Sequence, residues 1–249
     1  MQHRLEVRVE GVVFHSAILQ MSMNKMYFII IQCISDRLIG PTMYVPDHYR
    51  NADPAAALAW LRRYPFGTLI TRGPEGEPVA TSLPFFAQSD ATGTLRLVSH
   101  LARRNPHAAS LASGMRGLVV VNGPSAYISP HWYESAANVP TWNYVGLQWE
   151  GVLRVIADRQ GLLDLMQRSV RAFEPDGEDG WHMGKAPADH VDRLIEGVVG
   201  FELTVEVAHC MEKLSQNKPT DRAVIQSRLQ AGTPGFGPLV AQLMEEVAK

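Results

Sequence analysis

The sequence predicts a mainly β (α+β) fold, an antiparallel barrel with helices filling its ends. Two observations indicate it. Short apolar segments separated by turn residues fill the region from residue 67 to residue 122, and two long alternating segments follow at 142–157 and 198–211. Segments joined by tight turns favour antiparallel pairing, and the helical patterns are too few to cover a parallel sheet.

Six or so strands are expected. Segments 67–72, 78–88 and 94–100 are joined by turns at 73–78 and 89–93, and they predict a three-stranded antiparallel meander. Residues 116–122 form another apolar strand, which Ala126 and Tyr127 resume after a Gly-Pro turn.

Helices are expected around these strands. Asp53–Pro54 and Asn105–Pro106 each combine an N-cap residue with a first-turn proline, so a helix begins at each, the second running to about Ser113. A stripe of Leu and Met predicts a helix after Asp158. Shorter patterns predict helices within 187–197 and 219–230, the last capped by Thr220.

The composition indicates a globular protein. The 249 residues are 46% hydrophobic and 19% charged, with a net charge of −2, so the global charge does not favour a nucleic-acid or membrane surface. The longest apolar run, Met26–Ile34, falls well short of the roughly 20 residues that span a bilayer. Cys33 and Cys210 lie far apart, as in a reducing compartment. We therefore expect a cytoplasmic protein.

The chain divides by character into three parts. Residues 1–42 have no sustained pattern and are expected to be an N-terminal extension outside the fold, such as a wrong start codon would add. Residues 43–231 contain the predicted elements and form the domain. Residues 232–249 are rich in Ala, Gly and Pro and are expected to form a C-terminal tail.

Several site classes are disfavoured by spacing. His100 and His107 lie seven residues apart across a strand-to-helix junction, and no other histidines cluster as metal ligands do. Neither a Walker loop nor a Rossmann glycine fingerprint is present in the sequence. Metal and nucleoside-triphosphate chemistry are therefore not expected.

The segment Tyr127–Tyr144 is the first candidate for a site. It gathers three Tyr and two Trp around the prolines at 130 and 140, which suggests a shaped wall for a flat ligand or partner. The alternative is a strand pair and loop that cap a core, because Trp and Tyr are ordinary core residues.

The second candidate is SHLARRNPHAA, residues 99–109. A hydroxyl and two arginines at a helix start make a seat for a phosphate. The alternative is a solvated arginine pair. The third candidate is KLSQNK, residues 213–218, whose polar side chains could bond a heteroaromatic ring or simply cap a turn.

Four motifs together resemble the PaiB family of FMN-binding negative transcriptional regulators. They are MYVPDHYR (43–50), SHLARRNPH (99–107), YISPHWY with VPTWNY (127–144), and KLSQNK (213–218), in family order. The resemblance implies a split β-barrel of the pyridoxamine-phosphate-oxidase type, with peripheral helices, acting as a homodimer with FMN at the subunit interface. DNA is implied as a partner by this resemblance alone.

The same resemblance implies a set of cofactor-binding residues. The phosphate is expected at Ser99, His100, Arg103, Arg104 and Asn105, and the isoalloxazine ring beside Thr81, Ser82, Leu83 and Pro84. A second subunit would close the site with Trp142, Lys213, Ser215, Gln216 and Asn217. The chain departs from the family in residues 1–42 and at Ala108 and Ala109, where bulkier residues are usual.

Three functions fit these expectations. The first is an FMN-binding transcriptional regulator, although the sequence contains no convincing helix-turn-helix and few basic clusters beyond Arg62–Arg63. The second is a flavin-dependent oxidoreductase, with His131 or His100 as proton carrier. The third is a flavin or haem storage or breakdown protein, which would need an axial histidine, and neither His131 nor His209 lies in a context that demands one.

Overall fold

The computed structural model describes residues 8–9, 12–13, 43–134, 137–177 and 180–246. The chain divides into two compact units, Met1–Tyr44 and Val45–Lys249. In the first unit, β1 (Arg8–Val9) pairs antiparallel with β2 (Val12–Val13). The extension expected over 1–42, Cys33 included, lies mostly outside the described residues.

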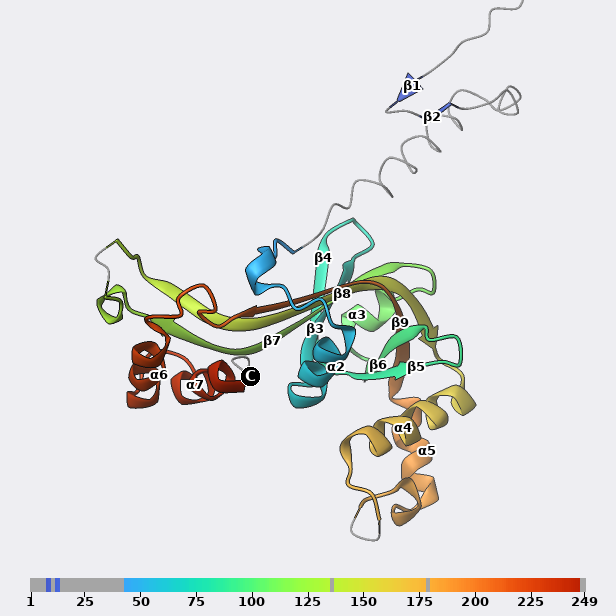
Figure 1. Ribbon diagram of the computed structural model, residues 1–249. Helices are drawn as coiled ribbons and strands as arrows, with labels where there is room; N and C mark the ends of the chain where they lie inside the picture. The colour runs from blue at the N-terminus through green and yellow to red at the C-terminus, as the bar shows by residue number, and fades with distance from the viewer. Residues whose placement is uncertain (1–7, 10–11, 14–42, 135–136, 178–179, 247–249) are drawn as a thin grey trace, which may run out of the picture. The chain divides into compact units, whose positions relative to one another are not determined.

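The second unit is built on one seven-stranded sheet in which all pairs are antiparallel, in the order β4-β3-β7-β8-β9-β6-β5. The strands are β3 (Phe66–Arg72), β4 (Pro78–Pro84), β5 (Phe86–Ser89), β6 (Leu95–Ala102), β7 (Arg116–Ile128), β8 (Thr141–Ile156) and β9 (Val198–Lys213). The sheet curls into a half-barrel, as Figure 1 shows. The expected α+β split-barrel fold is confirmed.

The barrel is split between β4 and β6. The segment expected as one strand, 78–88, is two: β4 ends at Pro84, the buried Phe85 turns into the core, and β5 begins at Phe86. β4 pairs with β3 at one edge of the sheet and β5 pairs with β6 at the other. The predicted three-stranded meander is therefore wrong, because the chain crosses at Phe85 from one sheet edge to the other.

The inner face of the sheet carries the main core, which includes Leu69, Leu97, Val119, Trp149 and Phe201. On the outer face, α4 (Arg159–Phe173) and α5 (Ala188–Glu196) cover one end with a second, smaller cluster. That cluster contains Phe86, Val98, Ile156, Leu162, Leu165 and Ile195. The rest of the outer face on β3, β7 and β8 stays partly exposed.

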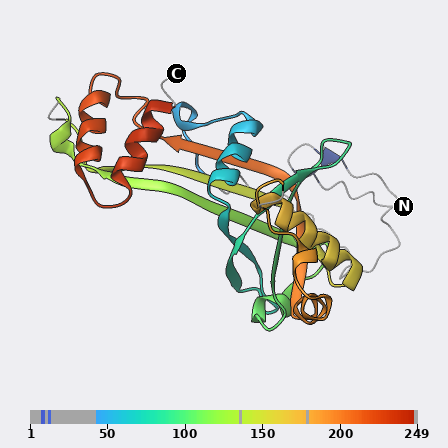
Figure 2. The ribbon, with the colours of Figure 1, turned by 90° about the horizontal axis from the view of Figure 1, so that it is seen from below.

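Strands β7, β8 and β9 continue beyond the barrel as an arm, and two helices lie against its far end (Figures 1 and 2). These are α6 (Arg222–Ala231) and α7 (Gly237–Glu246). Residues 232–249 were expected to form a tail, but α7 buries Val240, Leu243 and Met244 completely. Their i, i+3, i+4 spacing is helical, and the Gly- and Pro-rich lead-in conceals it in the sequence.

The predicted helix starts are mostly correct. Asp53 caps α2 (Pro54–Arg63), and Asn105 caps α3 (Pro106–Ser110), which is shorter than expected. Thr220 does not cap α6: the N-cap residue is Asp221, whose carboxylate accepts from the Glu134 N–H at 2.9 Å. Short 3-10 turns occur at η1 (Asp47–Tyr49), η2 (Pro130–Trp132) and η3 (Met183–Lys185). No described helix is long and apolar enough to cross a membrane.

Candidate functional site

The split of the barrel brings together two segments that are distant in sequence. Ser99 on β6 donates its Oγ proton to the Pro84 carbonyl oxygen on β4 at 2.7 Å. Ser99 is only 2% exposed, so this bond holds the two sheet edges together where no strand ladder joins them. Its hydroxyl proton is therefore already used, and the predicted role of Ser99 at a phosphate would have to rest on its lone pairs.

The four predicted residues of β4 divide between its two faces. Thr81 and Leu83 face inward, Leu83 being buried, whereas Ser82 and Pro84 face outward. Ser82 is exposed and its Oγ lies 3.4 Å from that of Thr68. Because β4 is an edge strand, alternate backbone N–H and C=O groups point away from β3 toward the split.

His107 anchors the start of α3 to the barrel. Its Nδ1 lies 2.9 Å from Thr81 Oγ1 and its Nε2 lies 2.9 Å from Thr71 Oγ1. Asn105 Nδ2 donates to the same Thr81 oxygen at 3.4 Å. Burial lowers the pKa of His107, which is 1% exposed, and favours the neutral ring. The sequence does not predict this role of His107, because its spacing from His100 raises only the question of a metal ligand.

The two arginines before α3 differ in environment. Arg103 Nε and Nη2 donate to the carbonyl oxygens of Glu196 and Val198, both at 2.8 Å, and so fasten the α5–β9 junction. Arg104 is exposed, and no described residue bonds its guanidinium. Helix α3 has only five residues, so its dipole gives little support to a phosphate. The exposed guanidinium of Arg104 is therefore the principal candidate for a phosphate partner.

His100 lies on the face of β6 opposite to Ser99. It pairs with Gly200, next to Val98, on the side covered by α4 and α5. Burial lowers the pKa of His100. The structure therefore does not bring His100 together with Thr81 and Asn105, and its predicted role at the cofactor is left without geometric support.

A second group of candidates lies on the arm. A pocket of about 290 Å³ opens at the irregularity of β7, where the pairing shifts between Asn122 and Ser125. Its lining residues are Asn122, Gly123, Ser125, Trp142, Tyr144 and Val145. The Trp142 residue is 44% exposed, and its ring stands edge-on to Tyr127 with the centroids 5.9 Å apart. Trp142 is thus an exposed ring in the lining of the pocket, with the partly exposed Tyr127 beside it.

Lys213 lies beside this pocket. It pairs in register with Tyr144, its Nζ donates to Thr141 Oγ1 at 2.5 Å, and it lies 5.9 Å from the Tyr49 ring centre. Burial lowers the pKa of Lys213. Burial also raises the pKa of Tyr49, although a hydrogen bond with Asn217 opposes this. We call Tyr49, Trp142, Tyr144, Lys213 and Asn217 the arm cluster.

The other two predicted site residues of the KLSQNK motif, Ser215 and Gln216, shape a turn. Ser215 is buried, has a φ of 61°, and its Oγ accepts from Asn143 Nδ2 at 2.9 Å. Gln216 Oε1 accepts from the Leu214 N–H at 2.8 Å, and its Nε2 donates to the Glu212 carbonyl. Both side chains are used within the chain, as the turn-capping alternative expects.

The aromatic segment 127–144 divides in the same way. Tyr127, Trp142 and Tyr144 lie on the outer face of the arm, whereas Trp132 and Tyr133 pack against the core. Lys218 Nζ lies 5.4 Å from the Tyr133 ring centre. The wall is thus three rings rather than five.

The arm cluster and the split are separate within one chain. Thr81 pairs across the sheet with Leu69, then Val119, then Trp149. Trp142 is seven residues from Trp149 along β8, about 23 Å at the usual rise of a strand. No bond in the described part of the chain joins the two groups.

The residues at these two places fit a flavin mononucleotide. Arg104 and Ser82 offer a charge and a hydroxyl for phosphate oxygens, and the open edge of β4 with Thr81 offers donors and acceptors for the polar edge of the ring. Trp142 and Tyr144 offer faces on which a flat ring stacks.

Comparison with known proteins agrees with this chemistry. A family described as "Putative FMN-binding domain" matches residues 43–207, more than half of the chain. Protease synthase and sporulation protein PAI 2 of Bacillus subtilis is 29% identical over 209 residues, which cover 83% of this chain and 99% of that protein. The flavocytochrome Anf3 of Azotobacter vinelandii superposes with a TM-score of 0.53 at 18% identity, over 70% of this chain and 74% of that one.

Proposed function

Because the chain belongs to the family described as "Putative FMN-binding domain", we propose that it binds FMN between the two copies of a homodimer and serves as a flavin-dependent regulator. The observation that carries the proposal is the separation of two complementary half-sites. The split offers a phosphate partner and a polar strand edge, and the arm cluster offers aromatic faces about 23 Å away along the strand direction. A second copy brings the arm of one chain to the split of the other.

Each half-site has its own task. Arg104 binds the phosphate, and the exposed hydroxyl of Ser82 on β4 is a second candidate donor. The edge of β4 and Thr81 bind the polar edge of the isoalloxazine ring. Trp142 and Tyr144 of the partner cover the ring and exclude water, and Lys213 contributes a positive charge near it. When bound, the flavin supplies reversible hydride and electron transfer.

The partly exposed outer face supports a dimer. Ile70, Leu118, Val120 and Val152 share this face, all of them partly exposed in one chain. Apolar side chains on the uncovered face of a sheet are typical of a surface that meets another subunit.

The likeness to PAI 2 supports the regulatory role, since that protein's name connects it with protease synthesis and sporulation. DNA would be the partner of such a regulator. The 290 Å³ pocket beside Trp142 favours a second candidate, a flavin-dependent oxidoreductase that acts on a small flat substrate.

The first experiment is a visible absorbance spectrum of the purified chain after incubation with FMN and removal of free flavin. Retained flavin bands, with one FMN per chain and a mass of two chains, support the proposal. A chain that retains no flavin, or retains it as a monomer, contradicts it. With flavin bound, NADH or NADPH oxidation supports the oxidoreductase, and a flavin-dependent DNA mobility shift supports the regulator.

A further inference from the structure

The hydrogen bonds that His107 makes with Thr71 and Thr81 determine which bonding group Thr81 has left for a ligand. A threonine hydroxyl has one proton to donate and two lone pairs that accept, and a neutral imidazole has one N–H and one accepting nitrogen. His107 is 1% exposed and Thr71 is 5% exposed, so water does not alter this count.

The bonds of Thr71 select the tautomer of His107. In the described part of the chain, the Thr71 hydroxyl has one partner, His107 Nε2, at 2.9 Å. If Nε2 carried the proton, the Thr71 proton would be buried without an acceptor, at the cost of a hydrogen bond that it makes in water. If Thr71 donates to Nε2, only lone pairs stay unused, which costs less. His107 therefore carries its proton on Nδ1.

That tautomer fixes the direction of the Thr81 hydroxyl. His107 Nδ1 then donates to Thr81 Oγ1 at 2.9 Å, and Asn105 Nδ2 donates to the same oxygen at 3.4 Å. Both lone pairs of Thr81 are occupied. Its proton is the one bonding group left, and Thr81 is a partly exposed residue of the edge strand β4, next to the split.

We infer that Thr81 donates a hydrogen bond to an accepting atom of the flavin ring, a carbonyl oxygen or an unprotonated ring nitrogen, and that His107 is the positioning residue that sets this direction. The inference rests on the proposed function, because it takes FMN as the ligand in the split. It adds that the atom beside Thr81 is an acceptor and never a ring N–H.

Two flavins and two variants test the ligand side. In Thr81→Val the proton is lost in a side chain of the same shape, and Thr81→Ser keeps the hydroxyl as a matched control. We expect Thr81→Val to weaken FMN and riboflavin alike, roughly tenfold, and Thr81→Ser to bind both as the wild type does. Riboflavin lacks the phosphate. A loss confined to FMN, or no loss at all, overturns the inference.

A measurement without flavin tests the protein side. Nitrogen-15 NMR of the full chain, with the His107 signals assigned from their absence in His107→Gln, reports which ring nitrogen carries the proton. A proton on Nδ1 supports the inference, and a proton on Nε2 overturns it, even if Thr81→Val fails to fold. If the wild-type chain binds no flavin but shows the Nδ1 proton, the proposed function fails while the hydrogen-bond order around His107 stands.

Discussion

At the scale of single residues, the two neighbouring arginines differ in what they already bond. Arg103 is occupied by the carbonyls of Glu196 and Val198, whereas no described residue occupies Arg104. We expect Arg104→Ala to weaken FMN binding by about 1.5–3 kcal/mol, the range for a hydrogen bond to a charged group. Flavin fluorescence titration measures this.

Arg103→Ala is the matched variant. It removes two bonds at the α5–β9 junction, so it should lower the free energy of unfolding by about 1–3 kcal/mol, with a smaller effect on FMN affinity. The assignment of Arg104 fails if Arg103→Ala causes the larger loss of FMN affinity and Arg104→Ala the larger loss of stability.

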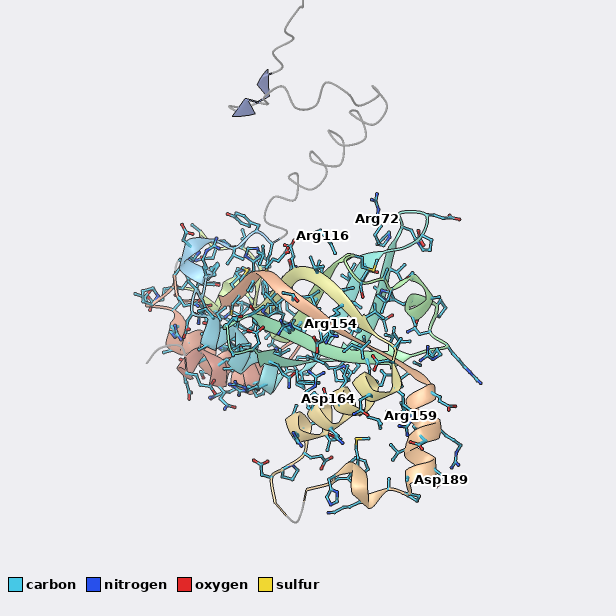
Figure 3. The ribbon with its side chains drawn as sticks, turned by 90° about the vertical axis from the view of Figure 1, so that its right-hand side faces the viewer. Arg72, Arg116, Arg154, Arg159, Asp164 and Asp189 are labelled. Atoms are coloured by element: carbon cyan, nitrogen blue, oxygen red, sulfur yellow. The ribbon has the colours of Figure 1, made fainter. Side chains whose placement is uncertain are left out.

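Glu202 is a buried carboxylate at the centre of a charge network. Arg154 Nη2 donates to its Oε2 at 2.8 Å and Arg168 Nη1 to its Oε1 at 3.1 Å. Figure 3 shows Arg154 on the sheet and Asp164, which pairs with Arg168, on the neighbouring α4. Burial raises the pKa of Glu202, but the two arginines outweigh it and hold the pKa below its usual 4.5.

A carboxylate with a lowered pKa stabilises the fold above its ordinary pKa, and this stabilisation is lost as the pH falls through the folded-state pKa. Glu202→Gln should therefore lower the free energy of unfolding at pH 7 by about 1.5 kcal/mol. The difference in free energy of unfolding between the variant and the wild type should become smaller below pH 4.5. Urea unfolding at several pH values measures it. Glu206→Gln, in the more exposed pair with Arg116, should change little, and an equal effect would contradict the network's role.

At the scale of elements, Gly200 lets α4 approach β9. A Cβ at Gly200 would meet Leu165 Cδ1 at 2.6 Å and Leu162 Cδ2 at 3.2 Å. We expect Gly200→Ala to push α4 from the sheet and to lower the free energy of unfolding by about 1–3 kcal/mol. Thermal unfolding measures this against Ala208→Ser, which adds one atom at an exposed position of the same strand. Equal melting temperatures would mean that α4 adjusts at no cost.

The sequence predicts elements well where one local signal is sufficient. The capped starts at Asp53 and Asn105 and the long alternating strands β8 and β9 are where the pattern places them. The division of 78–88 is not predictable locally, since it depends on which edge of the sheet each half joins. Helix α7 is not predicted because its buried apolar positions follow a Gly- and Pro-rich stretch.

The candidate site shows the same limit. Its motifs mark the segments that carry the candidate residues, but the alternation of β6 separates Ser99 from His100. The bonds of Ser215 and Gln216 become visible only once the turn is formed. His107 could have been found from its place directly after a capped Asn-Pro start, where a side chain is directed back toward the barrel.

At the scale of the whole molecule, the prediction concerns the second copy. Val120 lies on the outer face in one row with Thr68 and Gln148. We expect Val120→Lys to place like charges opposite each other across the proposed dimer interface. The variant should then give the mass of one 27.6 kDa chain in light scattering, with most flavin lost.

The control is Val224→Lys on α6, a comparably apolar and 41% exposed position away from that face. It should leave both the mass and the bound flavin unchanged. If the Val120→Lys chain is still dimeric, the dimer interface does not include Val120.

The split has a further consequence for how the chain avoids misassociation. An unpaired strand edge is a template on which another chain can add a strand and begin aggregation. β4 begins and ends with proline, at Pro78 and Pro84, and β5 is only four residues long. Proline offers no N–H to a ladder, so β4 lacks a donor at each of its ends. The β5 edge is too short to seed a growing sheet. The edge of β4 is thus open to the ligand proposed for the split and is a poor template for another strand.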